Sequence, residues 1–144
     1  MIEFKDEQER ERVLQALQDN MNEEFTATLQ YICHRISAKG VDNPLAESFK
    51  TAALDEMAHI LFFSDLISKY GEKPAFSEWK IDTSSDIRTM LEKDIELEQK
   101  AKARYTRQIQ QMKDHPDLVD LITSVLYDEE DHEKEFTGYL NKMR

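Results

Sequence analysis

A chain of 144 residues with 40% hydrophobic side chains has the length and apolar content of a single domain, residues 1–144. The formal charge of −11 disfavours nucleic-acid binding, because carboxylates repel phosphates and no cluster of Lys and Arg reverses that sign locally. The lone cysteine, Cys33, excludes an intramolecular disulfide and a Cys-x-x-Cys metal site, and we expect a soluble cytoplasmic protein without a membrane segment.

The chain contains only three Gly and three Pro against 34% charged residues, so the sequence predicts an all-α fold. A first helix is expected from about residue 6 to residue 38, with Gly40 ending it. Asn43, as the cap, and Pro44 begin a second helix that ends before Gly71. The third spans about residues 86–113, with residues 83–85 as candidate caps, and the fourth spans about residues 117–142.

Between the second and third helices lies the segment GEKPAFSEWKIDTSS, which has no helical periodicity. When extended at about 3.3 Å per residue, such a segment spans on the order of 45 Å. A helix of about 25 residues is only about 37 Å long. The segment is therefore long enough to cross the bundle, and the order of elements predicts a four-helix bundle with a long crossover between helices two and three.

The fourth expected helix contains the stretch YDEEDHEKEF, which places a Glu and a His three residues apart. The second contains the same Glu-x-x-His pair within LDEMAHI, and the first and third each contain a Glu followed seven residues later by a Tyr. Residues at i, i+3 and i+7 share one helix face, so these side chains are predicted to converge. The candidate metal ligands, which would also carry out the catalysis, are Glu24, Glu56, His59, Glu98, Glu129 and His132.

This donor set is typical of bundles that bind two iron or two manganese ions. Carboxylate oxygens and imidazole nitrogens suit either metal, and two ions about 3.5–4 Å apart can act on one dioxygen molecule. A single Glu-x-x-His pair on a charged helix is more often part of a solvated face, which leaves a metal-free helical interaction module as an alternative. Four carboxylates in one core without cations would be very unfavourable, so the whole pattern favours metal.

The stretches NEEFTATLQYICH, LDEMAHI, EKDIELE and LYDEEDHEKEF resemble the four metal-bearing helices of bacterioferritins, in the same order. The resemblance covers about residues 6–142. It implies a ferritin-like bundle in which the six candidate ligands form a ferroxidase centre for two iron ions. It also implies that Glu56 and Glu129 are the carboxylates that bridge the two ions.

Five other polar residues lie near the candidate ligands in the sequence. Tyr31 and Tyr105 fit either core positions or hydrogen-bond partners of the ligands. Asp94 could accept a hydrogen bond within the site or be a solvated carboxylate. The resemblance implies that it is the partner of Tyr31. His34 and His115 are not expected to belong to the site.

Met57 directly follows Glu56, and a rotation of 100° per residue turns its thioether away from the metal centre. From the residue type alone, an apolar contact at a dimer interface is a sufficient role. In bacterioferritins the Met at this position ligates haem iron at a twofold interface, one Met from each subunit. The resemblance therefore implies a haem site at Met57, with candidate walls at Phe25, Thr28, Leu29, Ile32 and Leu54.

The sequence ends twelve residues after His132, without the further short helix that helps bacterioferritins to assemble 24-subunit cages. The resemblance therefore implies a hollow homo-oligomeric cage of twelve subunits rather than 24. The expected function is oxidation of Fe²⁺ by dioxygen or peroxide, followed by iron storage. The alternative enzyme is a non-storing di-iron peroxidase or oxidase of the rubrerythrin kind, although the chain lacks the Cys-x-x-Cys motifs of a rubredoxin donor.

Overall fold

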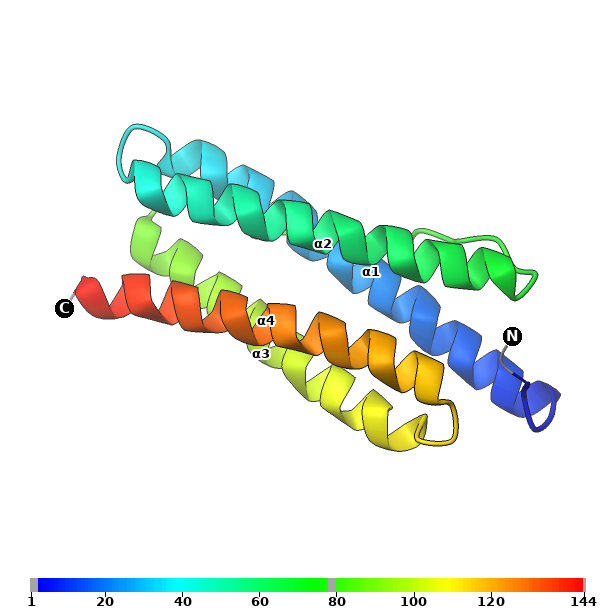
Figure 1. Ribbon diagram of the computed structural model, residues 1–144. Coiled ribbons are helices and arrows are strands. Elements are labelled where there is room, and N and C mark those ends of the chain that lie inside the picture. The colour runs from blue at the N-terminus through cyan, green and yellow to red at the C-terminus, as the bar shows by residue number, and fades with distance from the viewer. Residues whose placement is uncertain (1–2, 78–79, 144) are drawn as a thin grey trace.

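The computed structural model describes residues 3–77 and 80–143, which form four long helices. These are α1 (Glu7–Ala38), α2 (Asn43–Lys69), α3 (Ile87–Gln111) and α4 (Pro116–Lys142). α1 and α2 form one antiparallel pair, α3 and α4 form the other, and the crossover makes α2 and α3 run parallel (Figure 1). The predicted all-α bundle with a long crossover is confirmed. None of the helices in the described ranges is long and apolar enough to span a membrane.

The helix ends lie within two residues of the predicted bounds, but two of the expected caps are wrong. An Asp before each of the first three helices accepts a hydrogen bond from the backbone N–H three residues later: Asp6, Asp42 and Asp86. These carboxylates take the capping position, so Asn43 is the first residue of α2 and residues 83–85 precede the α3 cap. Gly40 and Gly71 have φ angles of 83° and 88°, a left-handed conformation that suits the turns after α1 and α2.

The apolar core is divided into two clusters. One cluster packs around Leu17, Phe63 and Ile122, and the other packs around Phe49, Leu91 and Phe136. In every helix the candidate ligands fall between the residues of the first cluster and those of the second. The bundle therefore has a polar layer at mid-height, enclosed above and below by apolar side chains, and the low dielectric of that setting strengthens electrostatic interactions within the layer.

The crossover lies along α1, and side-chain amides of α1 form hydrogen bonds with its backbone. Gln18 and Asn22 each donate to a crossover carbonyl and accept from a crossover N–H, at 2.9–3.0 Å. About two turns after Asn22 on α1, Gln30 accepts a hydrogen bond from the backbone N–H of Asp82 at 2.8 Å. Backbone groups that have no helix or sheet partner are thereby satisfied, which fixes the path of the crossover.

His34 is fully buried and ties the crossover to α3. Its Nδ1 lies 2.6 Å from Asp94 Oδ2, and its Nε2 lies 2.9 Å from Asp82 Oδ2. Burial alone would lower the pKa of His34, but the two carboxylates outweigh it and raise this pKa. Asp94 also accepts from Gln30 and is fully buried, so it is a structural partner of His34 and not a solvated carboxylate. His34 thus stays outside the metal ligand set, as expected.

Replacing His34 with Ala is expected to lower the free energy of unfolding by about 3 kcal/mol at neutral pH, because it leaves Asp94 buried without a cation. Urea unfolding followed by circular dichroism measures this change. His115→Ala is the matched control, because His115 bonds Glu9 in a half-buried setting at the end of the bundle. Equal losses from the two variants would contradict the anchoring role of His34.

Candidate metal centre

The six candidate ligands come together in the polar layer, and each is at most 5% exposed. Their donor atoms form two overlapping groups, in each of which all atoms lie within 4.8 Å of one another. The first group contains Glu24, Glu56, His59 and Glu129, and the second contains Glu56, Glu98, Glu129 and His132. Glu56 and Glu129 belong to both groups, which is the arrangement that two carboxylates shared between two ions would have.

Each imidazole directs Nδ1 into one of the two groups. His59 Nδ1 lies 3.5 Å from Glu24 Oε2 and 3.4 Å from Glu129 Oε1. In the second group, His132 Nδ1 lies 3.2 Å from Glu56 Oε1 and 3.3 Å from Glu98 Oε1. The i, i+3 spacing on a helix brings each His next to a carboxylate of its own helix, and the antiparallel pairing of helices adds the other carboxylates.

The hydrogen bonding of these atoms tests whether the site fits metal ions. Seven buried atoms that could coordinate a metal have no hydrogen-bond partner. They are one or both oxygens of each of the four Glu, and Nδ1 of both His. Buried polar atoms are normally satisfied, so seven unsatisfied atoms facing one another require another explanation. Divalent cations satisfy all of them at once, and hard oxygen with imidazole donors suits iron or manganese.

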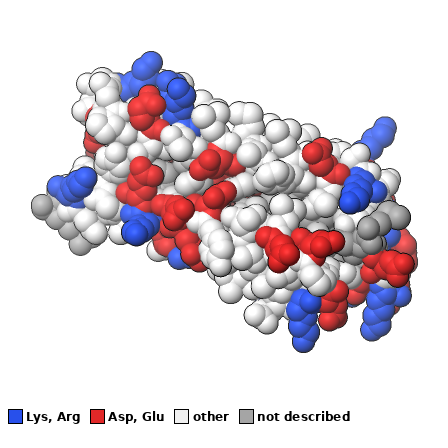
Figure 2. Space-filling model, viewed as in Figure 1, with Lys and Arg blue, Asp and Glu red and all other residues white. Residues whose placement is uncertain are grey.

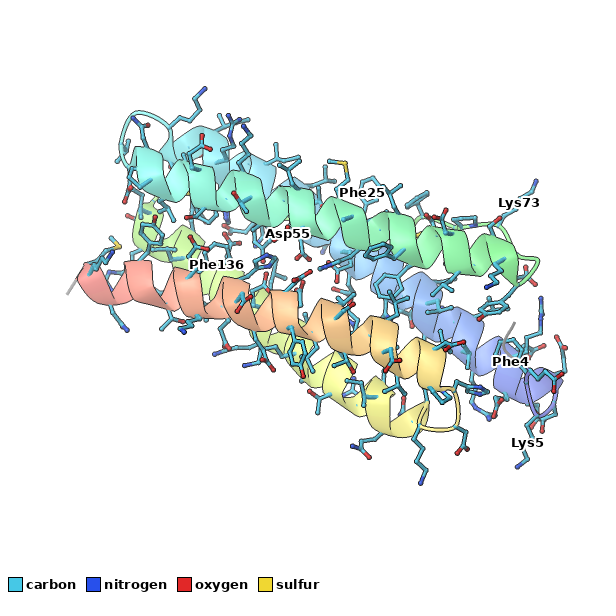
Figure 3. All side chains as sticks on the ribbon, viewed as in Figure 1. Phe4, Lys5, Phe25, Asp55, Lys73 and Phe136 are labelled. Carbon is cyan, nitrogen blue, oxygen red and sulfur yellow. The ribbon has the colours of Figure 1, made fainter. Side chains whose placement is uncertain are left out.

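The outer nitrogen of each imidazole is held by an Asp of the opposite helix pair. His59 Nε2 lies 2.7 Å from Asp128 Oδ2, and His132 Nε2 lies 2.8 Å from Asp55 Oδ2. Figure 3 shows Asp55 on the side of α2 that faces α4. An Asp that accepts from Nε2–H fixes the tautomer that leaves Nδ1 free for a metal.

The sequence interpretation missed this pairing of Asp55 and Asp128 with the imidazoles. The available signal was the repeated Asp-Glu-x-x-His in α2 and α4, in which an Asp precedes each Glu that is shared by the two groups.

The two remaining carboxylates are oriented by tyrosines. Tyr31 donates its hydroxyl hydrogen to Glu98, and Tyr105 donates to Glu24. Both rings are fully buried, so each hydroxyl has its partner within the polar layer. Tyr31 and Tyr105 are therefore both core residues and partners of candidate ligands, which joins the two alternatives that the sequence left open.

Without metal, the centre holds positive imidazoles among its carboxylates. Burial lowers the pKa of His59, but the nearby carboxylates of Glu129 and Glu24 raise it to about 11. For His132, burial is likewise outweighed by Asp55 and Glu98, which raise the pKa to about 10. Burial disfavours ionisation of Glu129, yet the neighbouring side chains of His59, Glu56 and Glu98 hold its pKa at about 2.

Glu56 and Glu98 behave oppositely to Glu129. Burial and the neighbouring carboxylates raise the pKa of both groups well above the ordinary value. Ionisation of these two side chains is therefore disfavoured in the metal-free protein, whereas Glu129 is ionised between the imidazoles. Because the imidazole pKa values are raised on folding, their contribution to stability is complete below about pH 6.5 and is lost as the pH rises toward 10–11.

Metal binding at pH 7 is expected to release protons, because His59 and His132 are protonated in the metal-free protein and must be neutral to coordinate a cation. We expect at least two protons per pair of ions, and an affinity for Co²⁺ that rises with pH. Calorimetric titration with Co²⁺ in buffers of different ionisation enthalpy measures the number released. Heats that are the same in every buffer would contradict this charge distribution.

The geometry can be compared with known proteins. A family model described as a ferritin-like domain matches residues 14–144. The chain belongs to the ferritin-like domain family. The match includes all six candidate ligands and every helix of the bundle, apart from the first turns of α1.

Several solved ferritin-like structures have the same fold. Mycobacterial bacterioferritin superposes with a TM-score of 0.84 and 24% identity over 92% of this chain and 84% of its own. A ferritin-like diiron-carboxylate protein from Bacillus anthracis strain Ames gives 0.83 and 22%, over 90% of this chain and 96% of its own. The dodecameric thioferritin of Bacteroides fragilis, a bacterioferritin-related protein, gives 0.82 and 20%, over 92% and 86%. The resemblance to bacterioferritins is confirmed at the level of fold, whereas comparison with curated protein sequences finds no match.

In this ferritin-like chain, Met57 lies on the outer surface of α2, with 43% of its area exposed. It points away from the polar layer, as its position after Glu56 predicted. Ile32 and Leu54 are also exposed, so the apolar surface extends over α1 and α2. Thr28 is not an exposed wall of this surface, because it is buried and its hydroxyl donates to the backbone carbonyl of Glu24 at 2.8 Å.

Proposed function

We propose that this protein oxidises Fe²⁺ to Fe³⁺ at the polar layer and stores the ferric product inside a hollow homo-oligomer. The observation that supports the proposal most directly is the set of seven unsatisfied donor atoms from all four helices, which can hold two iron ions per subunit. Manganese ions suit the same donors, so the geometry alone does not select iron, and iron is part of the proposal.

The residues have distinct tasks in this reaction. The carboxylates supply negative charge that favours Fe³⁺ over Fe²⁺, and Glu56 and Glu129 hold both ions close enough to reduce one oxidant together. With peroxide the balance is 2 Fe²⁺ + H₂O₂ + 2 H⁺ giving 2 Fe³⁺ + 2 H₂O. The imidazoles of His59 and His132 release protons when the ions bind, and Asp55 and Asp128 keep each Nδ1 directed inward.

The outer face of α2 and α4 fits the proposed path of iron. Figure 2 shows Asp and Glu side chains spread along this face, including its middle, with Lys and Arg mostly toward its ends. Asp55 and Asp128 lie here and contact the ligating imidazoles directly. A negative surface next to the centre raises the local concentration of Fe²⁺ and accepts the ferric product, as the inner wall of a storage cage would.

We propose a cage of twelve subunits. The fold of the chain matches that of a Bacteroides fragilis protein that is a dodecamer, and the exposed apolar surface of α1 and α2 offers a subunit contact. The single cysteine fits a reducing compartment such as the cytoplasm, in which Fe²⁺ persists.

Fe²⁺ oxidation is tested by adding two Fe²⁺ per subunit under argon and then admitting air or H₂O₂ while ferric absorbance is recorded. We expect rapid ferric absorbance with at least one oxidant, and no increase above buffer would overturn the proposal. Mass measurement of the assembly separates storage from the rubrerythrin kind of enzyme, because a dimer that oxidises Fe²⁺ cannot store it. A chain that binds no metal would instead be a helical interaction module.

We also propose haem binding at Met57, which the exposed apolar setting of its thioether supports. Titration with hemin is expected to give a sharp Soret band at one haem per two subunits, and Met57→Leu is expected to abolish it. Met143→Leu is the matched control, because Met143 is also 43% exposed but lies at the far end of α4. Equal spectra for the two variants would contradict a Met57 ligand.

A further inference from the structure

The candidate metal centre opens to the surface between α1 and α3, on the side opposite Asp55 and Asp128. A cavity of about 20 Å³ lies between α1 and α3 and reaches the bridging carboxylates Glu56 and Glu129. Its volume fits about one water-sized molecule. Ala27 and Ala101 flank it, and these small side chains leave room where larger ones would close the path.

Two cations line this cavity in a protein of net charge −11. Lys100 and Arg104 lie one turn apart on α3, and Glu23 on α1 is the one acidic residue of the lining outside the candidate ligands. Lys100 is exposed and pairs with Glu96 at 3.0 Å. The opposite face places Asp55 and Asp128 beside the imidazoles, whereas on this side Lys100 and Arg104 offset the charges of Glu23 and Glu96.

Arg104 is fixed at the opening by its neighbours. Its Nε donates to Asn20 Oδ1 at 3.3 Å, and the guanidinium lies 4.8 Å above the centre of the Tyr105 ring. Tyr105 in turn donates to Glu24. A guanidinium has five N–H donors, so these contacts leave donors for a small oxygen compound in the cavity.

Charge and size together select what this opening can admit. Fe²⁺ is attracted less here than at the face of Asp55 and Asp128, because Lys100 and Arg104 offset nearby carboxylates, and an organic substrate does not fit a cavity of this volume. Dioxygen is small enough, but it is apolar and gains little from a guanidinium. Hydrogen peroxide is nearly as small, accepts hydrogen bonds on both oxygens, and becomes a better acceptor as the O–O bond receives electrons.

We propose that the opening between α1 and α3 admits hydrogen peroxide and that Arg104, with Lys100 at the rim, is the residue that makes the centre selective for peroxide over dioxygen. This inference rests on the proposed Fe²⁺ oxidation and assigns its oxidant. Two Fe²⁺ supply the two electrons that break the O–O bond, and the oxygens leave as two water molecules after taking up two protons.

The test compares initial rates of Fe²⁺ oxidation by H₂O₂ under argon with rates under dioxygen. Arg104→Gln is expected to slow the peroxide reaction about tenfold, the effect of one charge-assisted hydrogen bond, and the dioxygen reaction less than about twofold. Arg104→Lys retains the charge and should recover part of the peroxide rate. Lys93→Gln is the matched control, because Lys93 is an exposed lysine of α3 that does not line the cavity.

The outcomes separate this inference from the proposed function. If Arg104→Gln slows both oxidants equally, or neither, the selectivity assigned to Arg104 is wrong although the protein oxidises iron. If Arg104→Gln does not fold, Lys100→Gln takes its place, because it alters an exposed side chain. This variant too must slow the reaction with peroxide more than the reaction with dioxygen. If the parent protein oxidises Fe²⁺ with neither oxidant, the proposed function fails first.

Discussion

Replacing Glu56 with Gln is expected to lower the rate of Fe²⁺ oxidation at least about a hundredfold, because Glu56 is shared by both donor groups. Loss of one oxygen donor weakens both ion sites and removes a bridge that keeps the two ions together. Anaerobic Co²⁺ titration followed by spectroscopy should show fewer than two ions bound per subunit. Glu92→Gln is the control, because Glu92 is an exposed carboxylate on α3 that belongs to neither donor group.

The same Glu56 variant separates a metal centre from a metal-free bundle through its stability. Both Glu56 oxygens lack hydrogen-bond partners in the metal-free protein, and its pKa is raised by burial and by neighbouring carboxylates. A neutral amide relieves this repulsion, so urea unfolding of the metal-free variant should show a gain of about 1 kcal/mol. A metal centre predicts this gain together with lost metal binding. A gain in stability with unchanged metal content would contradict it.

Divalent metal ions are expected to stabilise the fold strongly. At concentrations of about a hundred times the dissociation constant, each bound ion adds about 2.7 kcal/mol, so two ions add about 5 kcal/mol. For a domain of this size the midpoint of thermal unfolding should rise by about 10 °C or more. Differential scanning calorimetry with and without Mn²⁺ or Co²⁺ measures the change.

The control for metal stabilisation is the double variant Glu56→Gln, Glu129→Gln, which removes both shared carboxylates while retaining the imidazoles. Its unfolding midpoint should be nearly independent of metal. An equal rise in the parent and the double variant would show that the ions act elsewhere on this acidic surface.

The fold and the six candidate ligands could be predicted because they depend on spacing along single helices. Glu56 and His59 share a face of α2 whatever surrounds them, and the same holds for Glu129 and His132 on α4. The crossover followed from its length and its lack of periodicity. These features required no knowledge of how the helices are rotated or shifted relative to one another.

Contacts that depend on how the helices are rotated and shifted against one another could not be predicted from spacing along the sequence. Asp55 contacts His132 and not the imidazole of its own helix, because the rotation of α2 against α4 sets the partner. The pairing of Gln18 with the crossover requires the path of a segment that has no repeating pattern. The sequence of α3 contains many charged residues and does not single out Arg104, and only the packing of α1 against α3 places it at an opening.

Anomalous diffraction from crystals loaded anaerobically with Fe²⁺ tests the central claim most directly. The account predicts two peaks at the iron edge in each subunit, both in contact with Glu56 and Glu129, one also bound by His59 Nδ1 and the other by His132 Nδ1. Peaks confined to the surface carboxylates, with Glu24 and Glu98 left without metal, would contradict it.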